Sequence, residues 1–387
     1  MKKRVLIFST AYFPLVGGAE VAMKEITDRL PDFEFHLVCA KIQRDLSSSE
    51  RIGNVYVHRV GFGHPIDKYV LPVLGPMRAF FSLRSQRPNV VWSLMASYGG
   101  FAGLIYATFF RKVHFLLTLQ EGDPLEHYEK RVGKLSFAHK AIFKRADSVQ
   151  AISRFLGSWA TSMGFRGAPS IIPNGVTVSL FAKLISEGNR NAIRQNWGVG
   201  EHEKVLITTS RLSLKNGVDD VIRSLPLLPD GWKFVIVGDG EDRAMLEDLT
   251  HELGVWDRVR FVGLCAHSDL PELLQSADVF IRPSLSEGLG NSFLEAMTAG
   301  LPVIGTPVGG IPDFLLDGQT GIFCEVRNPE SIARAVQRLE DSALREKIIQ
   351  NGKLLVYEKY DWDRIAQHMK GLLEELMNSD NVEKAGK

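Results

Sequence analysis

Short apolar segments alternate with helical stretches along the whole of this 387-residue sequence. The apolar segments are continuous, which is typical of strands that are buried on both faces of a sheet. We expect strands in the first half at 5–9, 35–39, 56–59, 90–94, 115–119, 148–152 and 170–172, and in the second half at 205–209, 233–237, 259–262, 279–281, 303–305 and 321–324. This alternation predicts an α/β protein with parallel sheets covered by helices.

The length suits two domains rather than one core. We expect two Rossmann-like, doubly wound domains facing across a cleft, with the boundary near residue 178. The first domain comprises 1–178, and the second 179–361. An amphipathic helix over 362–378, with apolar Ile365, Met369, Leu372, Leu373 and Leu376, is expected to pack back across the first domain.

Composition indicates a soluble protein of a reducing compartment. Charged residues make up 24% of the chain, and the three cysteines, Cys39, Cys265 and Cys324, are far apart, which argues against a disulfide framework. The basic, apolar start (MKKRVLIFS) resembles a signal peptide, but a strand is the favoured interpretation because a Gly-rich loop and a helix follow it. The uncharged stretch 88–110 is interpreted as a strand, a Gly loop and a buried helix. We expect a cytoplasmic protein.

Polar and Gly-rich residues follow several predicted strands, where open α/β sheets bind ligands. Gly17 and Gly18 precede the first helix, where free backbone amides can meet an anion, although a plain turn explains them equally well. Arg211, Lys215 and Gly217 follow the strand at 205–209, and two cations there suit a diphosphate. Gly238 and Gly240 follow the next strand; this pattern is common and weakly specific.

The sharpest motif is RPSLSEGLGNSFLEAMTAGLP at 282–302. Glu287 lies in a loop with Gly288 and Gly290, and a helix is expected from about Ser292. Amides at that helix start can hold a phosphate without metal. Glu295 has a structural alternative, because Ser292 and Glu295 have the spacing of a capping box. A carboxylate such as Glu287 beside a Gly-rich loop has little structural reason to be there.

In the first half, the strand at 115–119 ends in Gln120, Glu121, Gly122 and Asp123. These polar groups are expected to face the cleft, with a turn capped at Asp123 as the alternative. No Cys/His cluster has metal-ligand spacing, so we expect neither a metal nor a cofactor.

Together these residues resemble the retaining glycosyltransferases of the GT-B fold, family 4 (group 1). The resemblance covers nearly the whole chain. It rests on Gly17-Gly18, IPNGV at 172–176, SRL at 210–212 with Gly217, GDG at 238–240, FVG at 261–263, SAD at 276–278, and above all Glu287 and Glu295 followed by AGLP at 299–302.

The resemblance implies that the C-terminal domain holds a nucleotide sugar, with UDP or GDP as the nucleotide, and that the N-terminal domain binds a glycan or lipid-linked acceptor. The implied catalytic residues are Glu287, Gln120 and Gly17. The implied donor-binding residues are Gly18, Arg211, Lys215, Asn216, Gly238, Val262, Gly288, Leu289, Gly290, Asn291, Ser292 and Glu295. Among them, Arg211 with a neighbouring Lys is expected on the diphosphate and Glu295 on the ribose.

Two positions in the expected site depart from the family pattern, beside a smaller change at Thr177, where Asp is frequent. Asn216 stands where a Lys is usual, with Lys215 one residue earlier, and Gln120 stands where a His is usual. Glutamine does not carry a proton at neutral pH, so a positioning role is expected there. The sequence thus predicts a metal-independent retaining hexosyltransferase. The alternatives are a nucleotide-sugar epimerase or phosphorylase of the same fold, or a non-catalytic nucleotide-sugar-binding protein.

The charge is divided unevenly. Residues 1–180 hold 23 Lys/Arg against 13 Asp/Glu, although the whole chain has a net charge of only +1. Basic residues are interleaved with apolar ones at 78–87 and 130–145, and in the second stretch Val132, Leu135, Ala138 and Ile142 have helical spacing. We expect peripheral contact with an anionic membrane at its inner face, and no contact with nucleic acid. The alternative is an ordinary helix whose apolar face is core.

Overall fold

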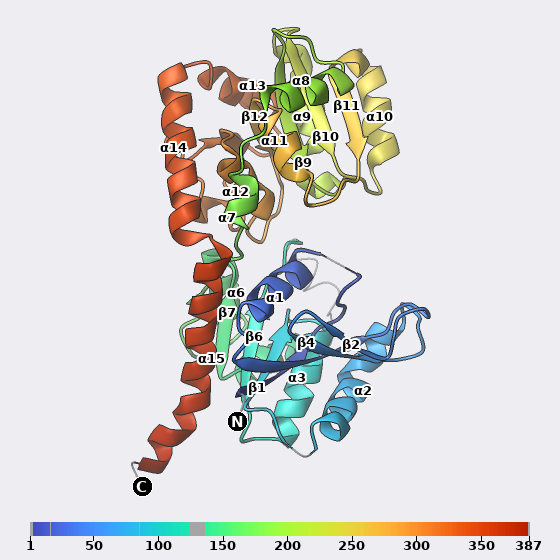
Figure 1. Cartoon of the computed structure of the whole chain (residues 1–387), viewed down its shortest axis with the longest axis vertical. Coiled ribbons are helices and arrows are strands. Elements are labelled where there is room, and N and C mark those ends of the chain that lie inside the picture. Colours follow the sequence, from blue (N-terminus) through green and yellow to red (C-terminus); the bar gives the residue numbers. More distant parts are fainter. Residues whose placement is uncertain (1–2, 16, 85, 124–135, 386–387) are drawn as a thin grey trace. The chain divides into compact units, whose positions relative to one another are not determined.

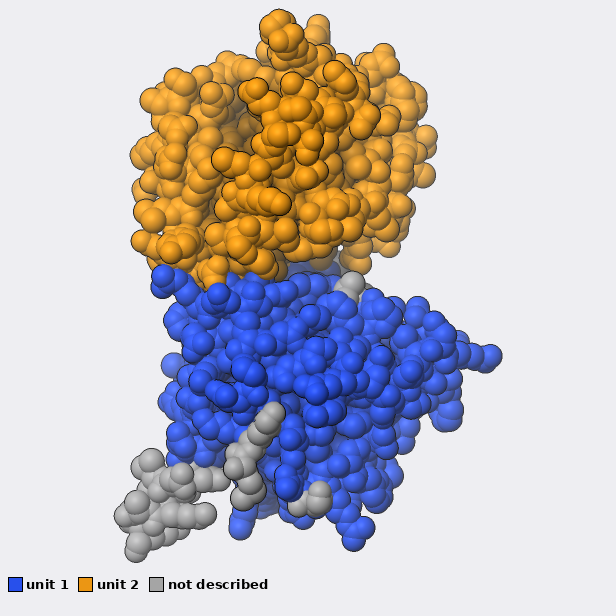
Figure 2. Space-filling view, viewed as in Figure 1, with its two compact units in different colours: residues 1–174, 362–387 blue, residues 175–361 orange. Residues whose placement is uncertain are grey.

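The computed structural model describes residues 3–15, 17–84, 86–123 and 136–385, with side chains up to residue 378. The chain forms two compact units: unit 1 is Met1–Asn174 with Trp362–Lys387, and unit 2 is Gly175–Asp361. Figure 2 colours the two units separately. The boundary expected from the sequence, near residue 178, lies about four residues later. Unit 2 begins earlier because Val176 is buried and its amide donates to the carbonyl of Tyr360 at 2.7 Å.

Unit 1 is built on an eight-stranded sheet in the order β3-β4-β2-β1-β5-β6-β7-β8. Every pair is parallel except β3 with β4. The strands are β1 Lys3–Phe8, β2 Phe33–Ala40, β3 Ser49–Ile52, β4 Val55–Val60, β5 Val90–Leu94, β6 His114–Leu119, β7 Ser148–Ala151 and β8 Ser170–Ile171. The helices described are α1 Gly18–Asp28, α2 Asp67–Ser82, α3 Tyr98–Phe109, α5 Ser136–Arg145, α6 Arg154–Ser162 and α15 Trp362–Ala385.

Helices cover both faces of this sheet (Figure 1). On one face, α1 and α15 pack against each other and against side chains of β1, β2 and β5, including Val5, Phe35 and Trp92. Trp362, Ile365, Met369 and Leu373 of α15 are buried there, as expected for the C-terminal helix, which runs beyond residue 378. On the other face lie α2 and α3, where Phe8 of β1 meets Tyr106 of α3 with ring centroids 6.0 Å apart.

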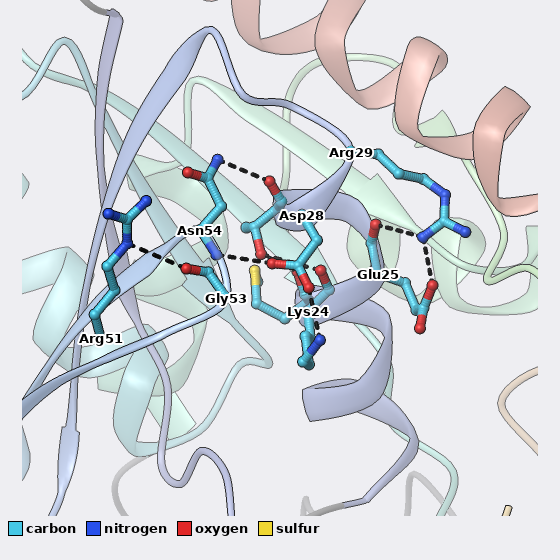
Figure 3. Close-up of polar contacts among 9 residues, drawn as sticks. Lys24, Glu25, Asp28, Arg29, Arg51, Gly53 and Asn54 are labelled. Carbon is cyan, nitrogen blue, oxygen red and sulfur yellow. Dashed lines mark hydrogen bonds and ion pairs between the residues drawn. The ribbon is translucent and has the colours of Figure 1, made fainter. Parts of the chain in front are cut away.

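The edge strand β3 was not predicted. Its sequence, SERI, is mostly exposed and polar, so it lacks the apolar run that marks the buried strands. A tight turn at Gly53, which has a positive φ of 56°, connects it to β4. The carboxylate of Asp28 at the end of α1 accepts the amide of Asn54 at 2.8 Å (Figure 3), so the turn is fixed to the helix.

Unit 2 has a six-stranded parallel sheet in the order β11-β10-β9-β12-β13-β14. The strands are β9 Lys204–Thr209, β10 Trp232–Val237, β11 Val259–Gly263, β12 Val279–Arg282, β13 Val303–Gly305 and β14 Ile322–Phe323. The α-helices are α7 Val178–Phe181, α8 Glu187–Asn196, α9 Val218–Ser224, α10 Arg243–Glu252, α11 Leu270–Gln275, α12 Asn291–Ala299, α13 Pro329–Arg338 and α14 Ser342–Lys359, with 3₁₀ turns η2 Leu214–Asn216, η3 Leu225–Leu227, η4 Trp256–Arg258 and η5 Ile311–Asp313.

The two stretches that resembled membrane signals form a strand, and a strand followed by a helix, as expected: the basic start is β1, and the uncharged stretch is β5 and α3. The loop expected at Gly99 and Gly100 was wrong, because both glycines lie in the first turn of α3, which begins at Tyr98. Gly99 and Gly103 let α3 lie close to the sheet, because a Cβ at Gly103 would meet Ser93 Oγ at 2.0 Å. No helix in the described part of the chain combines the length and the apolar character that a membrane span needs.

Candidate functional site

The loops after β9 and β12 meet at the switch point of the unit 2 sheet, where ligands bind in doubly wound folds. These two strands are neighbours, but their connections lead to opposite sides of the strand order. The amide of Leu285, after β12, donates to the carbonyl of Lys215, after β9, at 2.7 Å. Gly217 has a φ of 68° and lies so close to β12 that a Cβ would meet the carbonyl oxygen of Pro283 at 2.1 Å. The two loops predicted to bind an anion are therefore adjacent.

The loop after β10 packs against the loop after β9. Gly238 has a φ of 136°, and a Cβ there would meet the carbonyl oxygen of Ser210 at 1.9 Å. At Gly240 a Cβ would meet the carbonyl oxygen of Leu212 at 2.2 Å. Both glycines therefore have a packing reason to be glycine. Val262, on the next strand, is half-buried.

The three polar residues of the loop after β9 differ in exposure. Arg211 is exposed and Lys215 is half-buried, whereas Asn216 is only 6% exposed. The Asn216 side-chain amide donates to the carbonyl of Arg211 at 2.6 Å. Asn216 therefore fixes the shape of the loop that carries Arg211. A lysine at this buried position would not replace it, because a lysine ammonium is a point charge that requires solvation.

Glu287 is held by an arginine to which the sequence analysis gave no role. Arg282, at the end of β12, makes an ion pair with Glu287 Oε2 at 2.5 Å and donates to Ser292 Oγ at 2.7 Å. The amide of Gly288 donates to Glu287 Oε1 at 3.1 Å, and the amide of Gly310 donates to the Glu287 carbonyl, also at 3.1 Å. Arg282 thus ties the carboxylate to the start of the next helix. The only sequence signal for this contact is a cation at a strand end, five residues before Glu287, and no role was inferred from it.

Helix α12 begins at Asn291, with Gly290 as its N-cap in the left-handed conformation at φ 103°. This start places the amides of Asn291 and Ser292 in the first turn, where no residue of the helix accepts from them. Leu289, just before the cap, is buried and anchors the loop.

The capping-box alternative for Glu295 is wrong. Glu295 is the fifth residue of α12, too far from the Gly290 N-cap to fold back on it. Instead, Glu295 Oε1 lies 3.0 Å from Nε2 of His267, a residue that the sequence analysis did not single out. The carboxylate is 15% exposed and the His267 side chain is 55% exposed. Glu295 therefore faces the loop after β11 rather than its own helix end.

Buried hydroxyls gather in the same loops. A buried side-chain oxygen has no hydrogen-bond partner in the described part of the chain at Thr209, which ends β9, at Ser210 and Ser213 in the loop that follows, and at Ser284 after β12. Leaving a buried hydroxyl unpaired costs about 1–3 kcal/mol. Such a cluster at the switch point fits a site whose polar partner arrives with a ligand.

In unit 1 the predicted residue Gln120 follows β6. Its side-chain oxygen accepts from Nδ2 of buried Asn174, part of the IPNGV motif, at 3.2 Å. A buried chain of hydrogen bonds lies just behind it: Trp92 Nε1 donates to Thr118 Oγ1 at 2.7 Å, and Thr118 donates to Gln150 at 2.6 Å. This chain links β5, β6 and β7, so the strand end that carries Gln120 is rigid.

Glu121, next to Gln120, is only 2% exposed. Its Oε1 accepts the amide of Ala96 at 2.8 Å, and its Oε2 is buried with no hydrogen-bond partner among the described residues. Burial raises the pKa of this carboxyl to about 7, against the opposing effect of the backbone hydrogen bonds. A carboxyl that titrates near neutrality thus lies beside the position where the family pattern has a His.

Gly17 and Gly18 lie at the start of α1, as predicted, but the amide of Gly17 is occupied. It donates to Oε2 of Glu20 at 2.8 Å, and burial raises the pKa of that carboxyl. A Cβ on Gly18 would meet nothing within 4 Å, so close packing does not explain the second glycine.

The alternative of a turn capped at Asp123 falls partly outside the described residues. Asp123 is the last residue described after β6, and Pro124, the next residue of that turn, lies outside the described part of the chain.

Two family models match the chain. The model described as "Glycosyl transferases group 1" matches residues 189–355, and the model described as "Glycosyltransferase Family 4" matches residues 16–180. An uncharacterized glycosyltransferase of Methanocaldococcus jannaschii is 39% identical over 200 residues, which is 51% of this chain and 51% of that protein. The matched segment thus spans about half the length of that relative.

Solved structures match over nearly the full length. Sucrose-phosphate synthase from Thermosynechococcus elongatus superposes with a TM-score of 0.84 at 20% identity, covering 98% of this chain and 100% of that one. Anabaena HepE, solved in complex with UDP and glucose, superposes with a TM-score of 0.79 at 21% identity, covering 96% and 100%. At these identities the structures establish the fold. With the family models spanning both units, the chain belongs to the group 1 glycosyltransferases of the GT-B fold.

Proposed function

We propose that this chain is a retaining glycosyltransferase that moves a hexose from a UDP- or GDP-sugar to a glycan or lipid-linked acceptor without a metal ion. The observation that carries the proposal is the meeting of the β9 and β12 loops. There, cationic Arg211 and Lys215, the amides at the start of α12 and unpaired buried hydroxyls surround the switch point. HepE, which shares the fold, was solved in complex with UDP and glucose, and this supports a nucleotide sugar as the ligand.

Five of the predicted donor residues contact the nucleotide directly in this proposal. Arg211 and Lys215 bind the diphosphate, which they neutralise as the leaving group departs. The amides of Asn291 and Ser292 face the β-phosphate. Glu295 is turned towards the β11 loop by its contact with His267, and it accepts hydrogen bonds from the ribose hydroxyls.

Glu287 acts on the sugar. Its carboxylate is oriented by Arg282 and by the amide of Gly288, so it is held in one position before the donor binds. We place it beside the reacting carbon, where it supports the positive charge that develops as the bond to phosphate breaks. The acceptor hydroxyl then bonds to that carbon on the face the phosphate leaves, and its proton passes to the departing phosphate oxygen. No covalent enzyme intermediate is needed.

Unit 1 supplies the acceptor side of the reaction in this proposal. Gln120, fixed by Asn174 and by the rigid end of β6, positions the acceptor or the donor sugar but carries no proton. Gly17 and Gly18 line the same carboxyl edge of the unit 1 sheet. The excess of cations in residues 1–180 suits a phosphate-bearing acceptor and a peripheral place at an anionic membrane.

A donor panel tests the proposal. The full chain is heated with UDP, GDP, ADP and their hexose conjugates, and its melting temperature is followed. A nucleotide at about 100 times its Kd stabilises the native state by about 2.7 kcal/mol, so one base should give a clear shift. Arg211→Ala should reduce that shift. The control Arg334→Ala, which removes an exposed arginine from α13, should leave the shift unchanged. If no nucleoside diphosphate shifts the melting temperature, the assignment of the donor site is wrong.

A further inference from the structure

Helix α2 presents an apolar face to solvent. Its exposed large side chains, at three- and four-residue spacing, are Ile66 (57% exposed), Tyr69 (59%), Val73 (59%), Met77 (53%), Phe80 (37%) and Phe81 (64%). At 100° per residue they fall within a stripe of about 120°. The opposite side of the helix, with Leu71, Gly75 and Ala79, is buried against the sheet. Helix α2 is therefore apolar on both sides, although the core covers only one.

The exposed face of α2 continues onto the end of its neighbour α3. The two helices pack side by side (Figure 1), and the rings of Phe80 and Phe110 stack with centroids 5.8 Å apart. Phe109, the last residue of α3, is 79% exposed. Exposed apolar surface of this extent usually marks an interaction site. We call the stripe on α2 together with residues 109–112 the α2 surface.

The chain segment that carries the α2 surface is rich in cations and poor in carboxylates. Residues 51–120 contain eight Lys/Arg and a single acidic residue, Asp67. Asp67 is fully buried, where it accepts the amides of Phe62, Gly63 and His64 at 2.7–3.1 Å. This long segment therefore offers solvent only positive charge, which is complementary to an anionic partner.

A hollow at the edge of the α2 surface collects several of these cations. Arg87, Arg111 and Lys112, with His114, line a cavity of about 440 Å³ together with Phe109 and Phe110. The Arg87 guanidinium lies over the Phe110 ring, 5.0 Å from its centroid. Guanidinium and ammonium groups at a half-apolar hollow suit a phosphate whose remaining part is apolar.

We propose that the α2 surface docks unit 1 on an anionic membrane. Helix α2 lies in the plane of the interface with its apolar stripe among the acyl chains, and the cations of the hollow contact lipid phosphates. A second copy of the chain fits less well, because two cationic borders would repel each other. The proposal deepens the peripheral location proposed above and is independent of the donor site in unit 2.

Only one of the two basic segments of the sequence belongs to the α2 surface. The segment at 78–87 belongs to the end of α2 and the residues that follow it, with Arg78 exposed. The segment at 130–145 is described only from Ser136 onwards, as α5, in which Ile142 is fully buried and the rest of the predicted stripe lies outside the described residues or is half-buried. The membrane contact is therefore assigned to α2.

Vesicle co-sedimentation of the full chain tests the proposal. Vesicles of phosphatidylcholine alone are compared with vesicles that also contain phosphatidylglycerol, at about 50 mM and about 500 mM NaCl. The test variant is Val73→Asp with Met77→Asp, because both side chains are more than half exposed and their loss should not disturb the core. The matched control is Leu354→Asp with Tyr357→Asp on α14 of unit 2, which are 55% and 60% exposed.

The wild type and the control should sediment with anionic vesicles at low salt, and the test variant should bind at least about tenfold more weakly. High salt should reduce binding of the wild type. Equal binding to neutral vesicles, no binding to anionic ones, or equal binding by the test variant would overturn the proposal. The proposal would also be overturned if the wild type formed a dimer in the absence of vesicles and the test variant did not. Nucleotide binding by the test variant, measured by calorimetry, should match the wild type, so that failure here is separate from failure of the donor site.

Discussion

Replacing Glu121 with glutamine should make the stability of unit 1 less dependent on pH. The carboxyl is almost fully buried, one oxygen has no partner among the described residues, and burial raises its pKa from the ordinary 4.5 to about 7. Below pH 4.5 the group is protonated in the folded and unfolded chain alike. Between pH 4.5 and 7 the unfolded chain loses its proton while the folded chain retains it, so folding becomes less favourable as the pH rises.

The shift corresponds to about 3 kcal/mol, since one pKa unit is worth about 1.4 kcal/mol. The contribution of the neutral Glu121 carboxyl to the free energy of unfolding is fully present below pH 4.5. It is lost as the pH rises from 4.5 through 7. Glutamine is neutral throughout and retains an oxygen that accepts the amide of Ala96, so Glu121→Gln should be similar to the wild type at pH 5 and about 3 kcal/mol more stable at pH 8.

Urea unfolding of the full chain at pH 5 and pH 8 measures this difference, with hydrogen exchange of peptides from β6 reporting on unit 1 specifically. Glu358→Gln, on the exposed side of α14, controls for the removal of one negative charge. If the difference between Glu121→Gln and the wild type is the same at both pH values, the carboxyl does not titrate near neutrality and the reasoning from burial is refuted.

Three further predictions concern the donor site. Lys215→Ala should weaken nucleoside-diphosphate binding by about 1–3 kcal/mol, the scale of one charge-assisted hydrogen bond, and unchanged affinity by calorimetry would make Lys215 a surface charge. His267→Ala should weaken nucleotide binding by about 1 kcal/mol because Glu295 loses the contact that orients it; tighter binding would show instead that His267 competes with the nucleotide. Transfer should survive in EDTA, because cations and helix amides stabilise the phosphate in this proposal, and activity lost in EDTA but restored by Mg²⁺ or Mn²⁺ would contradict it.

Much of the fold follows from the sequence because the strands are buried on both faces. Continuous apolar runs marked β1, β5 and β9 to within a few residues. The exposed strand β3 has no such run and was missed. Helix α2 also gives a poor sequence signal, since Pro72 and Pro76 lie inside it and its apolar residues do not mark a single face.

The site followed from the sequence only in part. The rule that ligands bind beyond the carboxyl ends of parallel strands identified the loops after β9 and β12, and the structure brings these two loops together. The ion pair of Arg282 with Glu287 and the contact of His267 with Glu295 depend on tertiary packing, so spacing alone did not reveal them. The burial of Glu121 could not be inferred from its place in a polar run.

The most direct test of the central claim is turnover by Glu287→Gln. Glutamine still offers Arg282 an acceptor, and the Gly310 contact uses the Glu287 backbone, so the loop and nucleotide affinity should be retained. The full chain is supplied with the nucleotide sugar that the panel identifies, and release of nucleoside diphosphate is measured with acceptor or water. The variant should bind the nucleotide like the wild type and lose about 100-fold or more in kcat. Wild-type kcat in a folded, nucleotide-binding variant would contradict the role given to Glu287 and, with it, the proposed chemistry of the site.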